Sequence, residues 1–233
     1  MYEDNRKDIY DKGIDYSYIS LISSKINVGV IGGGKAGTIK TKHFVNNKCY
    51  VEVLSNTFSE EIIELSKVSK GRLKLINEEF SYEFLTDKHI IVIALDEEVL
   101  KNKIKKYCNE NYKIYIDSSN FTDGIGVVPI QKNTENITFA LNTKYGNPKG
   151  AVLVSNKVKT LLEEYDDFIG FMGKIRNKAK ELPEYKNEIL KFIGNDDFKK
   201  LFDEGKGESS LRSTFPKNVV DYLLKQINTI NSK

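Results

Sequence analysis

The sequence predicts an α/β protein whose first half is a doubly wound parallel sheet, and three observations support that prediction. Short, β-branched apolar runs alternate along the chain with segments of helical composition. The first run ends directly in glycines, as a buried parallel strand does before a tight turn. Strands and helices in this alternation are joined by right-handed crossovers, which build a parallel sheet.

Each element of this first half is predicted from its own residues. The Ile26–Ile31 run is followed by a helix at 38–46, and Ser59 with Glu60 and Glu61 has the form of a helix N-cap. The acidic turn Asp96-Glu97-Glu98 opens a helix that runs to about Glu110. The further strands are expected at 50–54, 72–76, 89–94 and 113–117.

The pattern changes after Asp117, where a turn-rich stretch leads to two paired strands at 127–130 and 137–141. A break at 146–150 precedes helices at 152–164 and 167–181, and from Pro183 the chain is helical with polar interruptions, including a loop at 205–213. We therefore expect a lead-in (1–24), a sheet domain (25–124), a small α+β module (125–165) and a helical C-terminal region (166–233).

Composition excludes several classes of protein. The chain has 233 residues, 39% hydrophobic and 30% charged, and its formal charge of +3 is too balanced for a dedicated nucleic-acid binder. Cys49 and Cys108 lie far apart, which suggests neither a disulfide framework nor a zinc site. No apolar stretch is long enough for a membrane span, and the charged N-terminus is unlike a signal peptide, so a cytoplasmic protein is expected.

The strongest motif is the glycine turn Gly32-Gly33-Gly34-Lys35-Ala36-Gly37. In a dinucleotide-binding turn of the Rossmann type, the first glycine allows the tight turn, the second lets the pyrophosphate approach, and the third lets the helix contact the strand. A structural glycine turn is the alternative, but this one follows a strand and precedes a helix. All six residues are therefore predicted to bind a dinucleotide.

The end of the second strand indicates which dinucleotide is bound. NAD-binding domains usually carry Asp or Glu there for the ribose hydroxyls, whereas this chain has Ser55 and Asn56. Neutral groups can still bind ribose, and no arginine stands nearby to pair with a 2′-phosphate. The residues favour NAD over NADP as the cofactor.

Four segments carry a resemblance to a known family: INVGVIGGGKAGTIKTKHF (26–44), EVLSNTFSEE (52–61), IVIALDEEVL (91–100) and GNPKGAVLVSNKVKTLL (146–162). Over about residues 19–165 the chain resembles the precorrin-2 dehydrogenases, a siroheme-synthase group that includes sirohydrochlorin ferrochelatases. The resemblance implies a homodimer, with residues 125–165 as dimerisation module, and NAD-dependent oxidation of precorrin-2 to sirohydrochlorin. It adds Ala94, Leu95 and Asp96 to the cofactor site, and some members also insert ferrous iron.

The resemblance also implies an essential aspartate at the end of the strand before the dimerisation module. Asp117 keeps the strand-end register, whereas a gapless count from Pro129 falls on Ser119, and Asp123 is held in reserve. The carboxylate would take the proton that accompanies hydride transfer. The alternative is that Asp117 only caps its turn through neighbouring amides.

Other groups are weaker candidates. A substrate with many carboxylates needs cations, and Lys132, Lys144, Lys149 and Arg176 could supply them, although each could equally be a solvated surface group. Lys40 belongs either to the helix surface or to the pyrophosphate site.

His43 and His89 have no ligand spacing, so structural roles and no protein metal site are expected. Leu95, Lys101 and Asn147 depart from the family pattern, which leaves a non-catalytic NAD-binding sensor or scaffold as the competing function.

Overall fold

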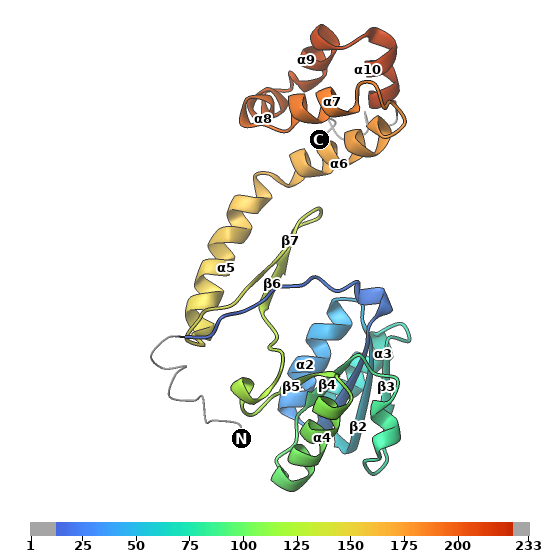
Figure 1. The fold of residues 1–233 in the computed structure, drawn as a ribbon, viewed down its shortest axis with the longest axis vertical. Helices are drawn as coiled ribbons and strands as arrows, with labels where there is room; N and C mark the ends of the chain where they lie inside the picture. The colour runs from blue at the N-terminus through green and yellow to red at the C-terminus, as the bar shows by residue number, and fades with distance from the viewer. Residues whose placement is uncertain (1–12, 226–233) are drawn as a thin grey trace. The chain divides into compact units, whose positions relative to one another are not determined.

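The computed structural model describes residues 13–225 and divides the chain into two compact units, Met1–Pro129 and Ile130–Lys233 (Figure 1). No helix in the described part of the chain is both long and apolar enough to cross a membrane.

The first unit contains a five-stranded sheet in the order β3-β2-β1-β4-β5, in which every neighbouring pair is parallel. Its strands are β1 (Asn27–Gly33), β2 (Tyr50–Phe58), β3 (Leu73–Ile76), β4 (Ile90–Ile93) and β5 (Ile114–Asp117). The strand order reverses on either side of β1, and this confirms the doubly wound α/β class. The carboxyl ends of β1 and β4 therefore flank the point where such folds bind ligands.

Helices cover both faces of this sheet. They are α2 (Lys35–Asn46), α3 (Glu60–Val68) and α4 (Glu98–Glu110), with short 3-10 helices η1 (Ser23–Lys25), η2 (Tyr82–Leu85) and η3 (Phe121–Asp123). Val28 and Val30 of β1 join one core cluster with α2 and α3, while Ile91 and Ile93 of β4 join another with α4. Because successive side chains point to opposite faces, strands covered on both faces are apolar throughout.

The predicted elements of this unit are present, with shifted ends. The helix after the glycine turn begins at Lys35, three residues before the predicted start, and β2 continues to Phe58. The predicted N-cap is confirmed, since the Ser59 side chain accepts a hydrogen bond from the Ile62 amide at 3.3 Å. Thr38 on α2 hydrogen-bonds Ser59 at 2.8 Å and so links the two helices.

The second unit begins with an antiparallel hairpin and continues as a helical bundle. Its elements are β6 (Ile130–Asn133), β7 (Thr138–Leu141), α5 (Pro148–Glu163), α6 (Asp166–Ala179), α7 (Lys186–Ile193), α8 (Asp196–Asp203), α9 (Gly207–Thr214) and α10 (Lys217–Leu224). The buried carboxylate of Asp166 accepts hydrogen bonds from the backbone N–H groups of Asn136 at 2.9 Å and Glu135 at 3.1 Å. This contact fastens the hairpin turn to the start of α6.

Two predictions for this unit were wrong. The first hairpin strand was placed at 127–130, but pairing starts at Ile130, opposite Leu141. Pro129 has no N–H to donate to a ladder, so the strand begins after it. The loop predicted at 205–213 is mostly helix α9, because Leu211 is fully buried and tertiary packing outweighs the low helix propensity of a Gly/Ser-rich segment.

Candidate functional site

The glycine turn connects β1 to α2 at the carboxyl edge of the sheet, and its glycines have three different environments. Gly32 has a φ of +113°, and a Cβ there would lie 2.2 Å from the Ala94 carbonyl oxygen. A Cβ on Gly37 would lie 1.9 Å from the Gly32 carbonyl oxygen. A Cβ on Gly34 would meet nothing within 4 Å. The first and third positions thus need glycine for the fold, while the second leaves open space above the backbone.

The N-terminus of α2 faces this space. Gly34 is the N-cap and supplies no capping side chain, while the Thr38 amide makes the first intrahelical bond to the Gly34 carbonyl at 2.9 Å. The amides of Lys35, Ala36 and Gly37 precede that bond and have no acceptor within the helix. First-turn amides and the positive end of the helix dipole together form an anion site that fits a pyrophosphate.

A cavity of about 880 Å³ opens at the same edge of the sheet. It is lined by Ile31 of β1, by Ser55 and Asn56 of β2, and by Leu95 after β4. Apolar and aromatic side chains, Leu54, Phe80, Tyr82, Leu100 and Tyr107, complete much of its wall. Apolar and aromatic side chains beside polar groups suit a nucleoside, because the base packs on apolar surface and the ribose hydroxyl groups need hydrogen-bond partners. The residues present therefore fit a dinucleotide, with its pyrophosphate over the turn and its adenosine in the cavity.

The structure brings most of the predicted cofactor-binding residues to this edge. Ser55, Asn56 and Leu95 line the cavity, and the glycine turn lies at the end of β1. Ala94 lies beneath the turn, in contact with Gly32, whereas Asp96 is exposed on the bend that follows. Asp96 does not line the cavity.

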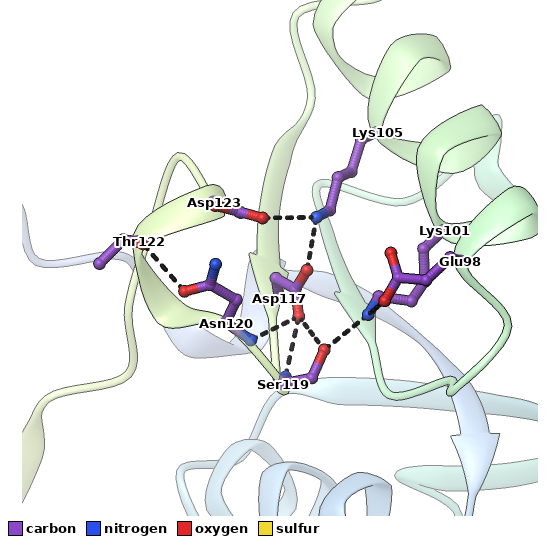
Figure 2. Close-up of polar contacts among 8 residues, drawn as sticks. All are labelled: Glu98, Lys101, Lys105, Asp117, Ser119, Asn120, Thr122 and Asp123. Carbon is purple, nitrogen blue, oxygen red and sulfur yellow. Dashed lines mark hydrogen bonds and ion pairs between the residues drawn. The ribbon is translucent and has the colours of Figure 1, made fainter. Parts of the chain in front are cut away.

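Asp117 ends β5 at the carboxyl edge of the sheet and is the centre of a polar network (Figure 2). Its Oδ1 accepts hydrogen bonds from the Ser119 amide at 2.8 Å, the Ser119 hydroxyl at 2.7 Å and the Asn120 amide at 3.0 Å. Its Oδ2 lies 2.6 Å from Lys105 Nζ on α4, which also contacts Asp123 at 3.2 Å. Both carboxylate oxygens are engaged.

A second lysine of α4 joins the same network. Lys101, one turn before Lys105, is buried, and its ammonium donates to Ser119 Oγ at 2.8 Å and to Glu98 at 2.5 Å. Sequence reasoning did not identify either lysine as part of a site. Their spacing of four residues on the helix that covers β5 was the available signal, since it puts both on one face.

These contacts determine the charge of Asp117. Burial alone would raise the pKa of this carboxyl, but the hydrogen bonds from Lys105, Asn120 and Ser119 outweigh it and hold the pKa at about 2. Contact with Asp117 and Asp123 raises the pKa of Lys105 despite its burial. At neutral pH the pair is fully ionised. The turn-capping contacts that the sequence left as an alternative role are present.

The remaining candidates lie elsewhere. His89 Nδ1 accepts a hydrogen bond from the Asn27 amide at 3.0 Å, where β1 begins. His43 lies edge-on to Phe44, and burial and the nearby charge of Lys40 lower the pKa of its imidazole. Lys40 is half-buried on α2, and burial lowers its pKa. Within residues 13–225 no cluster of three or more His, Cys, Asp or Glu side chains is arranged to hold a metal ion.

The predicted substrate-binding cations all belong to the second unit. Lys132 lies on β6, Lys144 in the turn after β7, Lys149 in the first turn of α5 and Arg176 on α6. The glycine turn and Asp117 belong to the first unit.

Comparison with known proteins agrees with this geometry. Residues 19–124 match the family model described as putative NAD(P)-binding. The precorrin-2 dehydrogenase of Priestia megaterium is 25% identical over 181 residues, covering 74% of this chain and 86% of the relative. The solved structure of SirC, precorrin-2 dehydrogenase, superposes with a TM-score of 0.66 at 23% identity, covering 84% of this chain and 98% of that one, which supports the fold. The chain is thus similar to precorrin-2 dehydrogenases over most of its length, and its residues 19–124 match the model of a putative NAD(P)-binding domain.

Proposed function

We propose that this protein oxidises precorrin-2 to sirohydrochlorin with NAD as hydride acceptor. The observation that carries the proposal is the glycine turn, in which Gly34 alone leaves space over the free first-turn amides of α2. It is supported by the adjoining cavity with Ser55 and Asn56, and by the similarity to a precorrin-2 dehydrogenase. Bound NAD would supply the chemistry by accepting a hydride from the reduced macrocycle.

The protein's own groups then have separate tasks. The amides of Lys35, Ala36 and Gly37 bind the pyrophosphate, and the side chains of Ser55 and Asn56 hydrogen-bond the adenosine ribose. These contacts fix where the nicotinamide end of the cofactor can reach, and a fixed geometry is what hydride transfer requires.

Asp117 is the proposed catalytic carboxylate, with Asp123 in reserve. Asp117 stands at the ligand-bearing edge and is ionised, but Lys105 and the amides of its turn already engage both oxygens. It can take a proton from substrate only after one of these contacts is exchanged. Asp123 is more exposed than Asp117, and its carboxylate also contacts Lys105. When Asp123 breaks that contact, the lysine can bind Asp117 alone or a carboxylate of the substrate.

The proposal includes a homodimer formed through α5. This helix of 16 residues buries only Ala151 and Ser155, while Val152, Leu153, Val154 and Leu161 are exposed. Apolar side chains at this density on one exposed helix are typical of a surface that a second copy covers. The side chains of Lys132 and Lys149 belong to the same module and are proposed, with Lys144, to bind substrate carboxylates.

The experiment that tests the function is an anaerobic incubation of the purified protein with precorrin-2 and NAD, followed by NADH absorbance. NADH formation that requires both reactants supports the dehydrogenase. Binding of NAD without turnover would favour the sensor or scaffold, and no NAD binding would overturn the site assignment itself. Adding ferrous iron to the product and following siroheme absorbance tests the iron insertion that some family members perform.

A further inference from the structure

The carboxylate that selects the adenosine ribose is missing from its usual place in the carboxyl-terminal part of β2, where Ser55 and Asn56 stand. Both residues line the cavity at the carboxyl edge of the sheet. Two glutamates, Glu78 and Glu79, line the same cavity from the segment after β3. The segment after β3 thus brings to the cavity the carboxylates that β2 lacks.

These groups follow neighbouring strands and line one cavity. β2 and β3 are parallel neighbours that pair as far as Leu54 opposite Ile76. Asn56 lies two residues past that pair on β2, and Glu78 lies two residues past it in the segment after β3. Neighbouring strands lie about 4.8 Å apart where they pair, and both residues line the same cavity, so the Glu78 carboxylate is placed to share a ribose with Asn56. Glu79 follows directly and brings a second negative charge to this end of the cavity.

The other charges of the cavity do not cancel these two. The wall also contains Glu97 and Glu110 together with Lys103 and Lys106. Lys106 lies 3.8 Å from Glu110. The wall contains four glutamates and two lysines, so the carboxylates outnumber the cations by two.

The nearest arginine along this part of the sheet cannot supply that cation. Arg72 stands just before β3, at the opposite edge of the sheet, where its guanidinium donates to the Lys48 carbonyl at 2.7 Å and lies over the Tyr50 ring. A 2′-phosphate in the cavity would therefore meet a wall that has two more carboxylates than lysines and no arginine.

We infer that Glu78 and Glu79 make this protein specific for NAD by excluding the 2′-phosphate of NADP. Their carboxylates accept hydrogen bonds from ribose hydroxyl groups, and they repel a phosphate that carries nearly two negative charges. The inference rests on the proposed function, since it assumes that a nicotinamide dinucleotide occupies the cavity.

The test compares the affinities of NAD and NADP for wild type and for the double variant E78Q/E79Q, by calorimetry. Glutamine keeps an acceptor for the ribose and removes the charge, so NAD affinity should change by less than about threefold while NADP affinity rises about tenfold. The gain should shrink between about 0.02 M and about 0.5 M salt, because added ions screen exposed charges. Both glutamates are exposed, so the variant is expected to fold.

The control is E163Q/E164Q, which removes two adjacent exposed glutamates from the second unit with the same change in net charge. An equal gain in NADP affinity in this control would overturn the inference, because the effect would then come from net charge. So would an unchanged NADP affinity in E78Q/E79Q. If wild type binds neither dinucleotide, the proposed function fails instead, and the two failures are therefore distinguishable.

Discussion

At the residue scale, Gly34 is the position where folding and binding can be separated. Because a Cβ built on it meets nothing within 4 Å, G34A should fold, with a loss of stability of about 0.5–1 kcal/mol since alanine is a poorer N-cap than glycine. The methyl group would occupy the space above the turn, so NAD affinity should fall at least about tenfold, and G34D should abolish binding through charge repulsion.

Calorimetry with NAD and thermal melts check this prediction. The control is G173A in α6, where a Cβ also meets nothing within 4 Å. Unchanged NAD affinity in a folded G34D variant would mean that the pyrophosphate lies elsewhere.

A second prediction concerns the proposed base. D117N preserves shape and removes basicity, so it should keep NAD binding and lower dehydrogenation by about 10²–10⁴-fold, as expected for a positioned acid/base group. D123N and S119A are the companion variants, since Asp123 shares Lys105 and Ser119 donates to Asp117. Full activity in D117N with loss in D123N would assign the proton transfer to Asp123. Three fully active variants would remove this network from the chemistry.

The same carboxylate should determine part of the pH dependence of stability. Its pKa falls from the ordinary 3.8 to about 2 on folding. A depressed pKa contributes stability above the unfolded value, and that contribution is lost as pH falls from about 4 to about 2. The loss should be about 2 kcal/mol and should be absent in D117N, as measured by urea unfolding across that range. If the free energy of unfolding changed with pH equally in wild type and D117N, the result would contradict the ion pair between Asp117 and Lys105.

What the sequence could predict at this scale depends on whether a recognisable motif carries the contact. The glycine roles were predictable because the spacing of a glycine turn between a strand and a helix defines them. The Lys101 and Lys105 contacts were not, because they join α4 to the turn after β5, across 18 residues for Lys101 and Ser119. Their spacing of four residues puts both lysines on one face of α4, but it does not show which residues that face meets.

At the element scale, α5 should hold two copies together. Leu153 is 60% exposed on a helix with few buried residues, so L153E should convert a dimer into a monomer, because an interface core does not accept an unpaired charge. Light scattering at micromolar concentration checks the mass. V68E on α3 is the matched control, since Val68 is 70% exposed in the first unit. A monomeric wild type would refute the dimer.

The elements also show where pattern reasoning is reliable. The five parallel strands were predictable because burial on both faces leaves uninterrupted apolar runs. Helix α9 was not, since its sequence GESSLRST has turn composition, and the burial of Leu211 decides its structure. The candidate site divides in the same way. The glycine turn was predictable from the sequence, whereas the place of Glu78 and Glu79 in the cavity wall was seen only in the three-dimensional structure.

At the scale of the whole molecule, the two units have separate cores. The clusters around Val30 and around Ile91 draw all their members from the first unit, and the cluster around Phe198 draws all of its members from the second. The nucleotide turn and cavity belong only to the first unit. Binding energy should therefore stabilise one unit and leave the other unchanged, unless the two cores melt as one.

This leads to a calorimetric prediction. At about 100 times the dissociation constant, NAD should add about 2.7 kcal/mol to the first unit, because a ligand that binds only the folded state stabilises it by mass action. For a domain of this size the gain raises the melting temperature by roughly 5–10 °C. Scanning calorimetry at fixed protein concentration should show two transitions, of which NAD moves one. G34D should show no such shift, and a single transition that moves as a whole would mean that the two cores unfold cooperatively.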